Sequence, residues 1–165
     1  MIRPSLVLIF IALLLGTGYF IDSSRQLLPP IMAVHFNAAG QANGFAPRDG
    51  YVDFMRLFST GIPLLVTLLV AGLPRLFPGA INLPYRDYWL APARREASIN
   101  FLSNHGLRFG CLLLLFLATV HWQVIQANTR RPPHLDGGAF TSVLMLFGLG
   151  LLVWVVAMLW RFWKR

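Results

Sequence analysis

Four stretches of this chain are long and apolar enough to cross a lipid bilayer, namely residues 4–21, 60–77, 107–127 and 139–160. An α-helix rises about 1.5 Å per residue, so a run of about 18 residues covers roughly 27 Å. That length is close to the thickness of the hydrocarbon core of a bilayer. We therefore expect an all-α membrane protein in which the chain, residues 1–165, forms one domain with four transmembrane helices.

The composition supports this interpretation. Hydrophobic residues make up 56% of the chain, charged residues make up 12%, and the mean hydropathy is +0.62. A soluble domain normally has about 25% charged residues, so this chain has too little charge to cover a surface in water. A cleavable signal peptide is the alternative for the first apolar run, but no cleavage site of small residues follows it. We expect a retained first helix.

The formal charge of +8 is best explained by membrane topology. With four spans, both termini lie on the same side as the second loop, residues 78–106. That side carries nine of the lysines and arginines, whereas the other side, with the first loop at residues 22–59, carries five. Because lysine and arginine are enriched in cytoplasmic segments, we expect both termini in the cytoplasm. The basic composition thus indicates topology, and we expect no nucleic-acid partner.

The first loop contains the one long segment that is neither strongly apolar nor basic, residues 28–50. Pro29 and Pro30 prevent a helix near its start. The residues that follow, 31–36, have the composition of a short β-strand. We therefore expect a structured extracytoplasmic loop.

Alternate residues of a β-strand share a face. Met32, Val34 and Phe36 are expected to pack on the helices, and His35 and Asn37 are expected to share the opposite face. His35 is then either a residue that presents a polar group to a partner or a buried residue that pins the loop. Both alternatives are open at this point.

Turn signals and a helix start follow this strand. Gly40 and the Asn43–Gly44 dipeptide indicate turns, and the dipeptide is typical of a type I′ β-hairpin. Asp49 is a suitable N-cap for a helix that starts at Gly50 and continues into the second span. The loop is therefore expected to be hairpin-like.

The second loop carries aromatic and basic side chains of the kind that anchor a protein at the membrane interface. Together with the end of the chain, it supplies the expected anchors Tyr85, Tyr88, Trp89, Arg94, Arg95 and Trp163. Pro92 suits the first turn of a helix, and Gly106 can end it. We expect this helix to lie flat on the cytoplasmic surface, with a solvated connecting helix as the alternative.

Gly106 and Gly110 form a G-x-x-x-G pattern at the start of the third span. Small residues at this spacing let helices approach closely in a membrane. We expect the pattern to serve packing within the bundle rather than dimerisation. The oligomeric state stays open.

Few residues in this sequence suit transport or catalysis. No Asp or Glu lies in a predicted span, which argues against a proton- or cation-coupled carrier. No serine lies in a nucleophile motif, so we expect no enzymatic activity. His35, His121 and His134 lie on the predicted outer side, where histidines and carboxylates can bind a metal ion, but no pair has tight ligand spacing. We expect no metal and no other cofactor, and we interpret His121 as an interfacial residue.

Residues 30–44 contain the string P-x-x-x-x-H-F-N-x-x-G-x-x-N-G directly after the first span. This string resembles a bacterial membrane family of unknown function, and a domain of that family also forms the N-terminal part of the Sdp toxin-immunity protein. The matching positions are Pro30, His35, Phe36, Asn37, Gly40 and Gly44. Asn43 stands where an Asp is common, and Arg48 is near a usual Lys. The later string NLPYRDYWLAPARR is also similar to a segment of stand-alone members.

The resemblance implies a multi-span protein of the bacterial inner membrane without catalytic activity. For the immunity relative it implies a role in neutralising or sensing a peptide toxin at the outer face. This chain is shorter than that relative and lacks its additional spans. The resemblance therefore favours an immunity-like or regulatory role, but it does not indicate a particular toxin.

Two hypotheses about function follow. In the first, the protein is non-enzymatic, and residues 28–50 bind or sense a peptide or protein partner outside the lipid bilayer. The residues assigned to partner binding or to ordering of the loop are Pro30, His35, Phe36, Asn37, Gly40, Asn43 and Gly44. In the second, the protein is a structural or assembly subunit of a larger membrane complex. A metal-dependent enzyme at the outer face is a third hypothesis, which metal in the purified protein would support.

Overall fold

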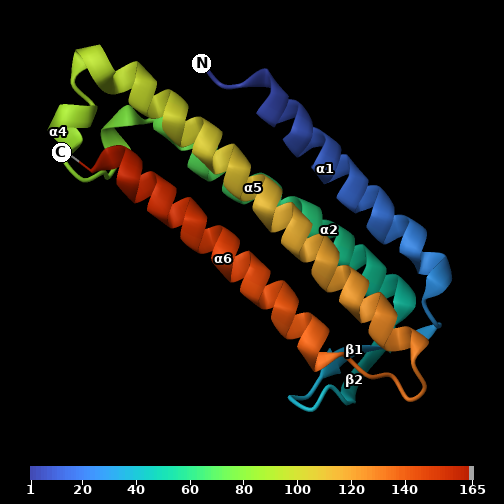
Figure 1. The fold of residues 1–165 in the computed structure, drawn as a ribbon. Coiled ribbons are helices and arrows are strands. Elements are labelled where there is room, and N and C mark those ends of the chain that lie inside the picture. The colour runs from blue at the N-terminus through green and yellow to red at the C-terminus, as the bar shows by residue number, and fades with distance from the viewer. Residues whose placement is uncertain (164–165) are drawn as a thin grey trace.

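The computed structural model describes residues 1–163. Four helices are long and apolar enough to span a membrane, and a small antiparallel hairpin follows the first of them (Figure 1). The predicted fold class is therefore confirmed. The main elements are α1 (Pro4–Ser24), β1 (Ile31–Phe36), β2 (Ala42–Pro47), α2 (Arg48–Thr67), α5 (Pro92–Thr129) and α6 (Gly137–Phe162). Short helical turns connect them, namely η1 (Arg25–Leu27), the π turn η2 (Leu68–Gly72), α3 (Leu73–Leu76), η3 (Pro78–Ala80) and α4 (Arg86–Trp89).

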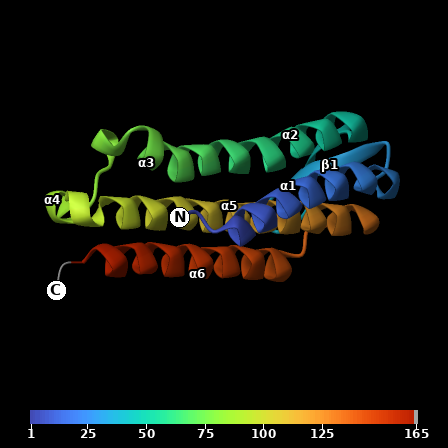
Figure 2. The same ribbon diagram turned by 90° about the horizontal axis from the view of Figure 1, so that it is seen from above.

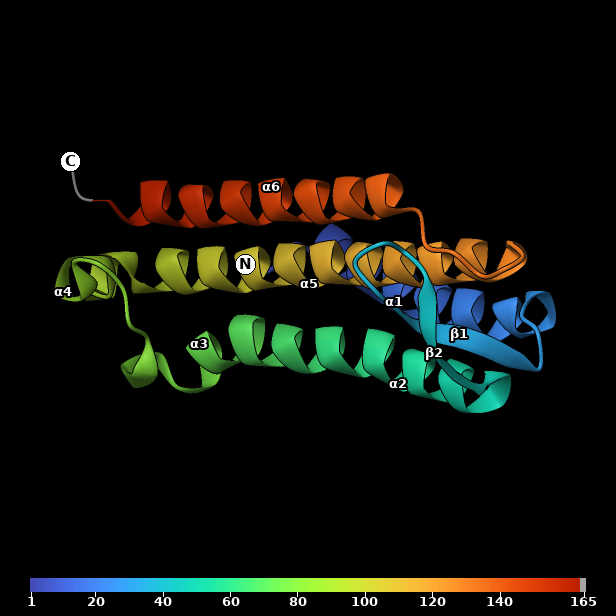
Figure 3. The ribbon, with the colours of Figure 1, turned by 90° about the horizontal axis from the view of Figure 1, so that it is seen from below.

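Helix α5 is the centre of the bundle. Helices α1 and α2 pack on α5 and on each other, and α6 packs on α5 from the side away from α2 (Figures 2 and 3). The hairpin lies at the end of the bundle that is opposite the C-terminal end of α6 (Figure 1). No residue in the most apolar stretch of α6 is buried within the protein. The outer face of this helix therefore needs the apolar surroundings that lipid provides.

The π turn interrupts the helical segment that contains α2 and α3. Pro74 has no backbone N–H, and its ring clashes with the carbonyl one turn earlier, so a regular α-helix cannot continue here. The hydroxyl of Ser103 donates a hydrogen bond of 2.8 Å to the carbonyl of Ala71, within this turn. The irregular turn is thus tied directly to α5.

Gly106 lies where α5 passes the π turn. A Cβ atom at this position would lie 2.8 Å from the backbone nitrogen of Ala71, so only glycine allows the two backbones to approach this closely. The prediction that a separate helix ends at Gly106 is wrong, because α5 is continuous over 38 residues, or about 57 Å. Residues 92–106 continue directly into the helix of the third span instead of forming a separate helix.

The hairpin turn lies earlier than the sequence indicates. The Oδ1 atom of Asn37 accepts hydrogen bonds from the backbone nitrogens of Ala39, at 3.0 Å, and Gln41, at 2.9 Å. Gly40 has a φ of +76°, a conformation that glycine adopts without strain. The prediction of a turn at Asn43–Gly44 is wrong, since both residues lie in β2. An asparagine that bonds its own backbone makes the turn instead.

The start of α2 also differs from the prediction. The helix begins at Arg48, and Pro47 precedes it without a side-chain cap. Asp49 is not the N-cap, because it lies in the first turn and its carboxylate binds Arg25. Proline has its φ fixed near the helical value and helps to start a helix without a capping side chain.

Burial along β1 follows the expected alternation only in part. Met32 is 1% exposed and His35 is exposed, as the alternation predicts. Ala33 is also fully buried, although the register of the two strands is regular from Ile31 to Ala33. Two consecutive residues of this strand are therefore buried, which alternation does not predict.

We expect the substitution Gly106→Ala to destabilise the protein by about 1–3 kcal/mol, because the new Cβ must displace the backbone of the π turn η2. Thermal unfolding in detergent measures this as a lower midpoint temperature. Gly148→Ala in α6 is the matched control, because a Cβ there meets no atom within 4 Å, and it should leave the midpoint unchanged or raise it slightly. Equal midpoints for the two variants would contradict the close approach at Gly106.

Candidate functional site

The residues that the sequence singles out gather in the hairpin, which we call the cap (residues 31–47). Asn128, in the last turn of α5, holds it from one side. Its Oδ1 atom accepts a hydrogen bond of 2.8 Å from the nitrogen of Ala33, and its Nδ2 atom donates one of 2.9 Å to the carbonyl of Ala33. Nδ2 also donates to the carbonyl of Val124. The side-chain amide of Asn128 thus makes the two backbone hydrogen bonds that a neighbouring strand would otherwise make with Ala33.

The linker between α5 and α6, residues 130–136, holds the turn of the cap. The nitrogen of Leu135 donates a hydrogen bond of 2.8 Å to the carbonyl of Gly40, and Gln41 forms a β-bridge with His134. A Cβ on Gly40 would collide with the carbonyl of Leu135. Gly40 is therefore required both by its positive φ and by this contact.

Asp136 ends the linker and caps α6. Its Oδ1 atom accepts a hydrogen bond of 3.0 Å from the nitrogen of Ala139, and its Oδ2 atom lies 3.2 Å from Nη2 of Arg130. The Ala139 N–H, with a smaller effect from Arg130, holds the pKa of Asp136 below its usual range. The carboxylate form therefore stabilises this junction at neutral pH. That stabilisation is lost as the pH falls from the ordinary aspartate pKa of about 3.9 through the lower folded value.

An ion pair joins the end of α1 to the start of α2. The guanidinium of Arg25 lies 2.5 Å from the carboxylate of Asp49 and 2.8 Å from that of Asp53. The two carboxylates are four residues apart, which places them on one face of a helix. They are therefore partners of one arginine rather than a pair of catalytic acids.

Below the cap, His121 lies between α1, α2 and α5. It is 0% exposed, so the interpretation of His121 as an interfacial residue is wrong. Its Nε2 atom lies 2.9 Å from the hydroxyl of Ser24, and its Nδ1 atom lies 3.0 Å from the hydroxyl of Tyr51. Tyr51 also stacks on the imidazole, with ring centroids 5.7 Å apart. His121 is four residues from Leu117 and from Ile125, which are both buried. This helical spacing is the sequence signal that could have predicted the burial of His121.

The hydrogen bonds of Ser24 decide how the imidazole is protonated. The Ser24 hydroxyl donates its one proton to the carbonyl of Ile21, at 2.7 Å. Its oxygen must therefore accept a hydrogen bond from Nε2–H of His121, which leaves Nδ1 as the acceptor for Tyr51. The imidazole is neutral in this arrangement, and all its hydrogen-bonding groups are paired.

An apolar groove with a volume of about 470 Å³ opens between the cap, α2 and α5. Both strands and both helices contribute side chains to it. The main lining residues are Val34, Ala46, Tyr51, Phe54, Val120 and Val124. Phe54 is 59% exposed, so the groove is open at this side chain and can receive an apolar group.

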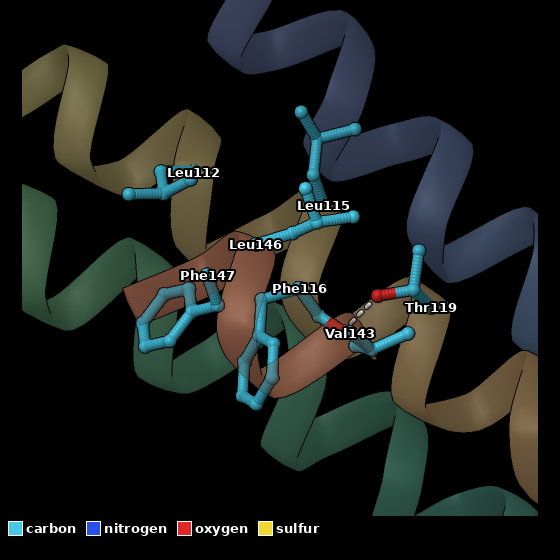
Figure 4. A pocket seen from close by; sticks show the side chains of 7 residues that line it. All are labelled: Leu112, Leu115, Phe116, Thr119, Val143, Leu146 and Phe147. Atoms are coloured by element: carbon cyan, nitrogen blue, oxygen red, sulfur yellow. Dashed lines mark hydrogen bonds between the residues drawn. The ribbon is translucent and has the colours of Figure 1, made fainter. Parts of the chain in front are cut away.

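A second, smaller hollow of about 170 Å³ lies between α5 and α6 (Figure 4). Its lining is apolar except for Thr119, whose hydroxyl already donates to the carbonyl of Phe116 at 2.7 Å. No lining side chain is left with a free polar group. We interpret this hollow as an imperfection of helix packing that faces lipid.

The structure places all seven predicted loop residues in or next to the cap. His35 is exposed, and its Nδ1 atom lies 2.5 Å from Oδ1 of Asn43. The alternative that His35 is a buried residue is therefore wrong. Within residues 1–163, no group of three or more His, Cys, Asp or Glu side chains could hold a metal ion. Both ring nitrogens of His121 are hydrogen-bonded, to Ser24 and to Tyr51, so neither is free to bind a metal ion.

The predicted interface anchors lie at the other end of the bundle. Tyr85 and Trp163 make an edge-to-face contact with centroids 6.4 Å apart, and the guanidinium of Arg94 lies 4.0 Å from the ring centroid of Tyr88. Trp89 donates a hydrogen bond of 2.8 Å from Nε1 to the carbonyl of Phe162. Aromatic side chains with polar tips suit the headgroup layer of a bilayer.

Comparison with known proteins finds no matching family model, no matching curated protein and no matching solved structure.

We expect Asn128→Leu to loosen the cap, because the N–H and C=O of Ala33 lose their partner. Limited proteolysis should then cut within residues 31–47 several times faster than in the wild-type protein, with the cleavage sites read by mass spectrometry. Thr129→Val is the control, since Thr129 is exposed and its hydroxyl bonds only within its own helix. Equal cleavage rates would show that Asn128 does not hold the cap.

We expect His121→Leu to lower the free energy of unfolding by about 1–3 kcal/mol, because the hydroxyls of Ser24 and Tyr51 stay buried without their imidazole partner. Thermal unfolding in detergent is the measurement. Trp122→Leu, at a neighbouring position that is 47% exposed, is the control. A midpoint for His121→Leu as high as that of the control would argue against the buried hydrogen bonds.

Proposed function

We propose that this chain is a non-enzymatic multi-pass membrane protein whose cap binds a peptide or protein partner, in an immunity-like or regulatory role. Four apolar helices are compatible with a multi-pass membrane protein. The partner would add to the open edge of β2 as a further strand and place an apolar side chain in the groove. The open edge is the observation that carries the proposal.

The direction of the backbone groups of Phe45 supports an open edge. Ala33 and Phe45 are paired in the hairpin, and both backbone groups of Ala33 point away from β2, toward Asn128. In an antiparallel pair of this kind, the backbone groups of the opposite residue also point outward. The N–H and C=O of Phe45 therefore face away from β1, and within residues 1–163 no hydrogen bond is made there.

The linker explains why this edge stays open. His134 bridges Gln41 and so begins a third strand beside the cap. The residues before His134 are Pro132 and Pro133, which have no N–H to donate. Pairing between the linker and β2 therefore ends before Phe45.

The surroundings of the edge favour an apolar partner. Ile31, Phe45 and Phe54 are each about 60% exposed, at 60%, 59% and 59%. The groove below the cap lies beside Phe54. A strand added to an exposed edge gains affinity from main-chain hydrogen bonds and specificity from side-chain pockets. The cap offers both, and Asn128 and the linker hold it in one position.

The buried Ser24–His121 pair supports a non-enzymatic role. A serine nucleophile must be exposed to its substrate and must give its proton to the histidine. Ser24 is 1% exposed, and its proton is donated to the carbonyl of Ile21. The pair therefore stabilises the bundle, and we assign it no catalytic step.

We further propose that the protein lies in a bacterial inner membrane with both termini in the cytoplasm. The support is the bias of nine lysines and arginines against five between the two predicted sides of the membrane, together with the resemblance of residues 30–44 to a family of bacterial membrane proteins. The cap, at the end opposite the C-terminal end of α6, would then face outward. The rival role as an assembly subunit has less support, because lipid satisfies the exposed face of α6.

Partner binding can be tested with a photo-crosslinking amino acid at position 54, in cells that produce the full chain. We expect a crosslinked partner that is lost in Phe45→Pro and kept in Phe45→Leu, because only proline removes the outward N–H. Position 149 in α6, which is 58% exposed, is the control for crosslinks to unrelated membrane proteins. Crosslinks that survive Phe45→Pro at full yield, with the protein still folded, would contradict strand addition.

A further inference from the structure

At the end of the bundle away from the cap, where α6 ends at Phe162, the chain between α3 and α5 folds over the start of α5. It borders two open surface clefts of about 280 and 310 Å³. Pro78 and Arg95 line both clefts, so the two adjoin. Arg86 lines the first cleft and Arg75 the second. Three arginines from separate helical elements therefore line these two adjoining clefts.

Two of these arginines are oriented by neutral groups. Arg86 donates from Nε to the carbonyl of Ile81, at 3.1 Å, and from Nη2 to the carbonyl of Gly79, at 3.0 Å. Arg75 donates to the hydroxyl of Ser103 and to the side-chain amide of Asn100. These bonds orient both guanidinium groups. Arg86 also has the carboxylate of Asp87 at 3.8 Å from Nη1, whereas no acidic side chain in the described part of the chain pairs with Arg75. Each guanidinium has five N–H donors, so each keeps donors for a ligand.

Arg95 is available to a ligand in a different way. Its side chain is exposed. No residue in the described part of the chain forms a hydrogen bond or an ion pair with this side chain, although the backbone nitrogen of Arg95 donates to the carbonyl of Ala91. It lies in the first turn of α5, where Ala91 precedes the helix and provides no side-chain cap. The positive end of the helix dipole therefore adds to the charge of this arginine.

The charge of the clefts suits a single phosphate diester. Asp87 and Glu96 are the acidic lining residues. Three arginines and two carboxylates leave a net charge of three minus two, or +1. One phosphodiester carries one negative charge. The carboxylates could accept hydrogen bonds from the hydroxyl or ammonium group of the headgroup that the phosphate carries.

The Arg75 side of the clefts lies beside the start of the first span, where lipid headgroups are expected. Asn104 of α5 donates to the carbonyl of Met1 and accepts from the nitrogen of Arg3, so the first span starts at the level of Asn104. The side chain of Arg75 reaches Asn100 and Ser103, within about one helical turn of that level. Aromatic contacts surround the same end, including Tyr85 with Trp163. A membrane lipid is therefore the nearest source of a phosphodiester.

We propose that these clefts form a specific binding site for the phosphodiester headgroup of a membrane phospholipid, with Arg75, Arg86 and Arg95 as the phosphate ligands. Arginine is well suited to this role because its planar group donates two parallel hydrogen bonds to phosphate. The site lies at the opposite end of the bundle from the cap and does not depend on partner binding there.

The test is native mass spectrometry of the full-length protein in a maltoside detergent, which contains no phosphate. Phosphatidylglycerol, phosphatidylethanolamine and inorganic phosphate are titrated separately. We expect one phospholipid to bind the wild-type protein. Arg95→Gln should weaken this binding about tenfold, since it removes a charge-assisted hydrogen bond. Arg95 is exposed, so the variant should keep the wild-type unfolding temperature.

Arg131→Gln is the matched control, because Arg131 is exposed at the end of the bundle that carries the cap. This variant should bind the phospholipid as the wild-type protein does. Equal lipid affinities for Arg95→Gln and the wild type would overturn the proposal. Inorganic phosphate binding as tightly as the lipids would overturn the assignment to a lipid. A preference for phosphatidylethanolamine that disappears in Glu96→Gln would support the assigned role of the carboxylates.

Discussion

The position of the hairpin depends on the two hydrogen bonds between Asn128 and the backbone of Ala33. A two-stranded hairpin is marginally stable by itself, so it needs a partner on at least one edge. Asn128 provides a donor and an acceptor at the last turn of the central helix, and the linker before α6 adds a short bridge at the turn. With these contacts in place, the edge of β2 at Phe45 stays open.

Buried polar pairs hold the helices together in the same way. Lipid is as apolar as the side chains that face it, so helix association in a membrane relies on close packing and hydrogen bonds. Ser24 and Tyr51 meet at His121 near the cap, and Ser103 bonds the π turn at the other end. Helix α6 joins α5 through His105 and Trp154, which exchange hydrogen bonds of 3.0 and 2.9 Å and stack their rings.

Sequence reasoning locates the four spans and the hairpin-like loop because both leave local signals. Long apolar runs predict helices, and Pro30 followed by an alternating segment predicts a strand. The predictions from sequence are wrong at Gly106, at the Asn43–Gly44 dipeptide and at His121. Gly106 has the identity of a helix terminator, but it is needed for contact with Ala71. His121 is close to the end of a span, and only the approach of α1 and α2 buries it.

The amino-acid sequence by itself determined that the chain belongs in a membrane, which segments form helices and where the turn-forming residues are concentrated. These properties follow from hydrophobicity and from backbone geometry within a few residues. Tertiary structure decided which polar groups are paired, such as Ala33 with Asn128, and which edge and clefts stay open. The physical reason is that each of these contacts joins residues distant in the chain, so neither residue's own neighbours reveal its partner.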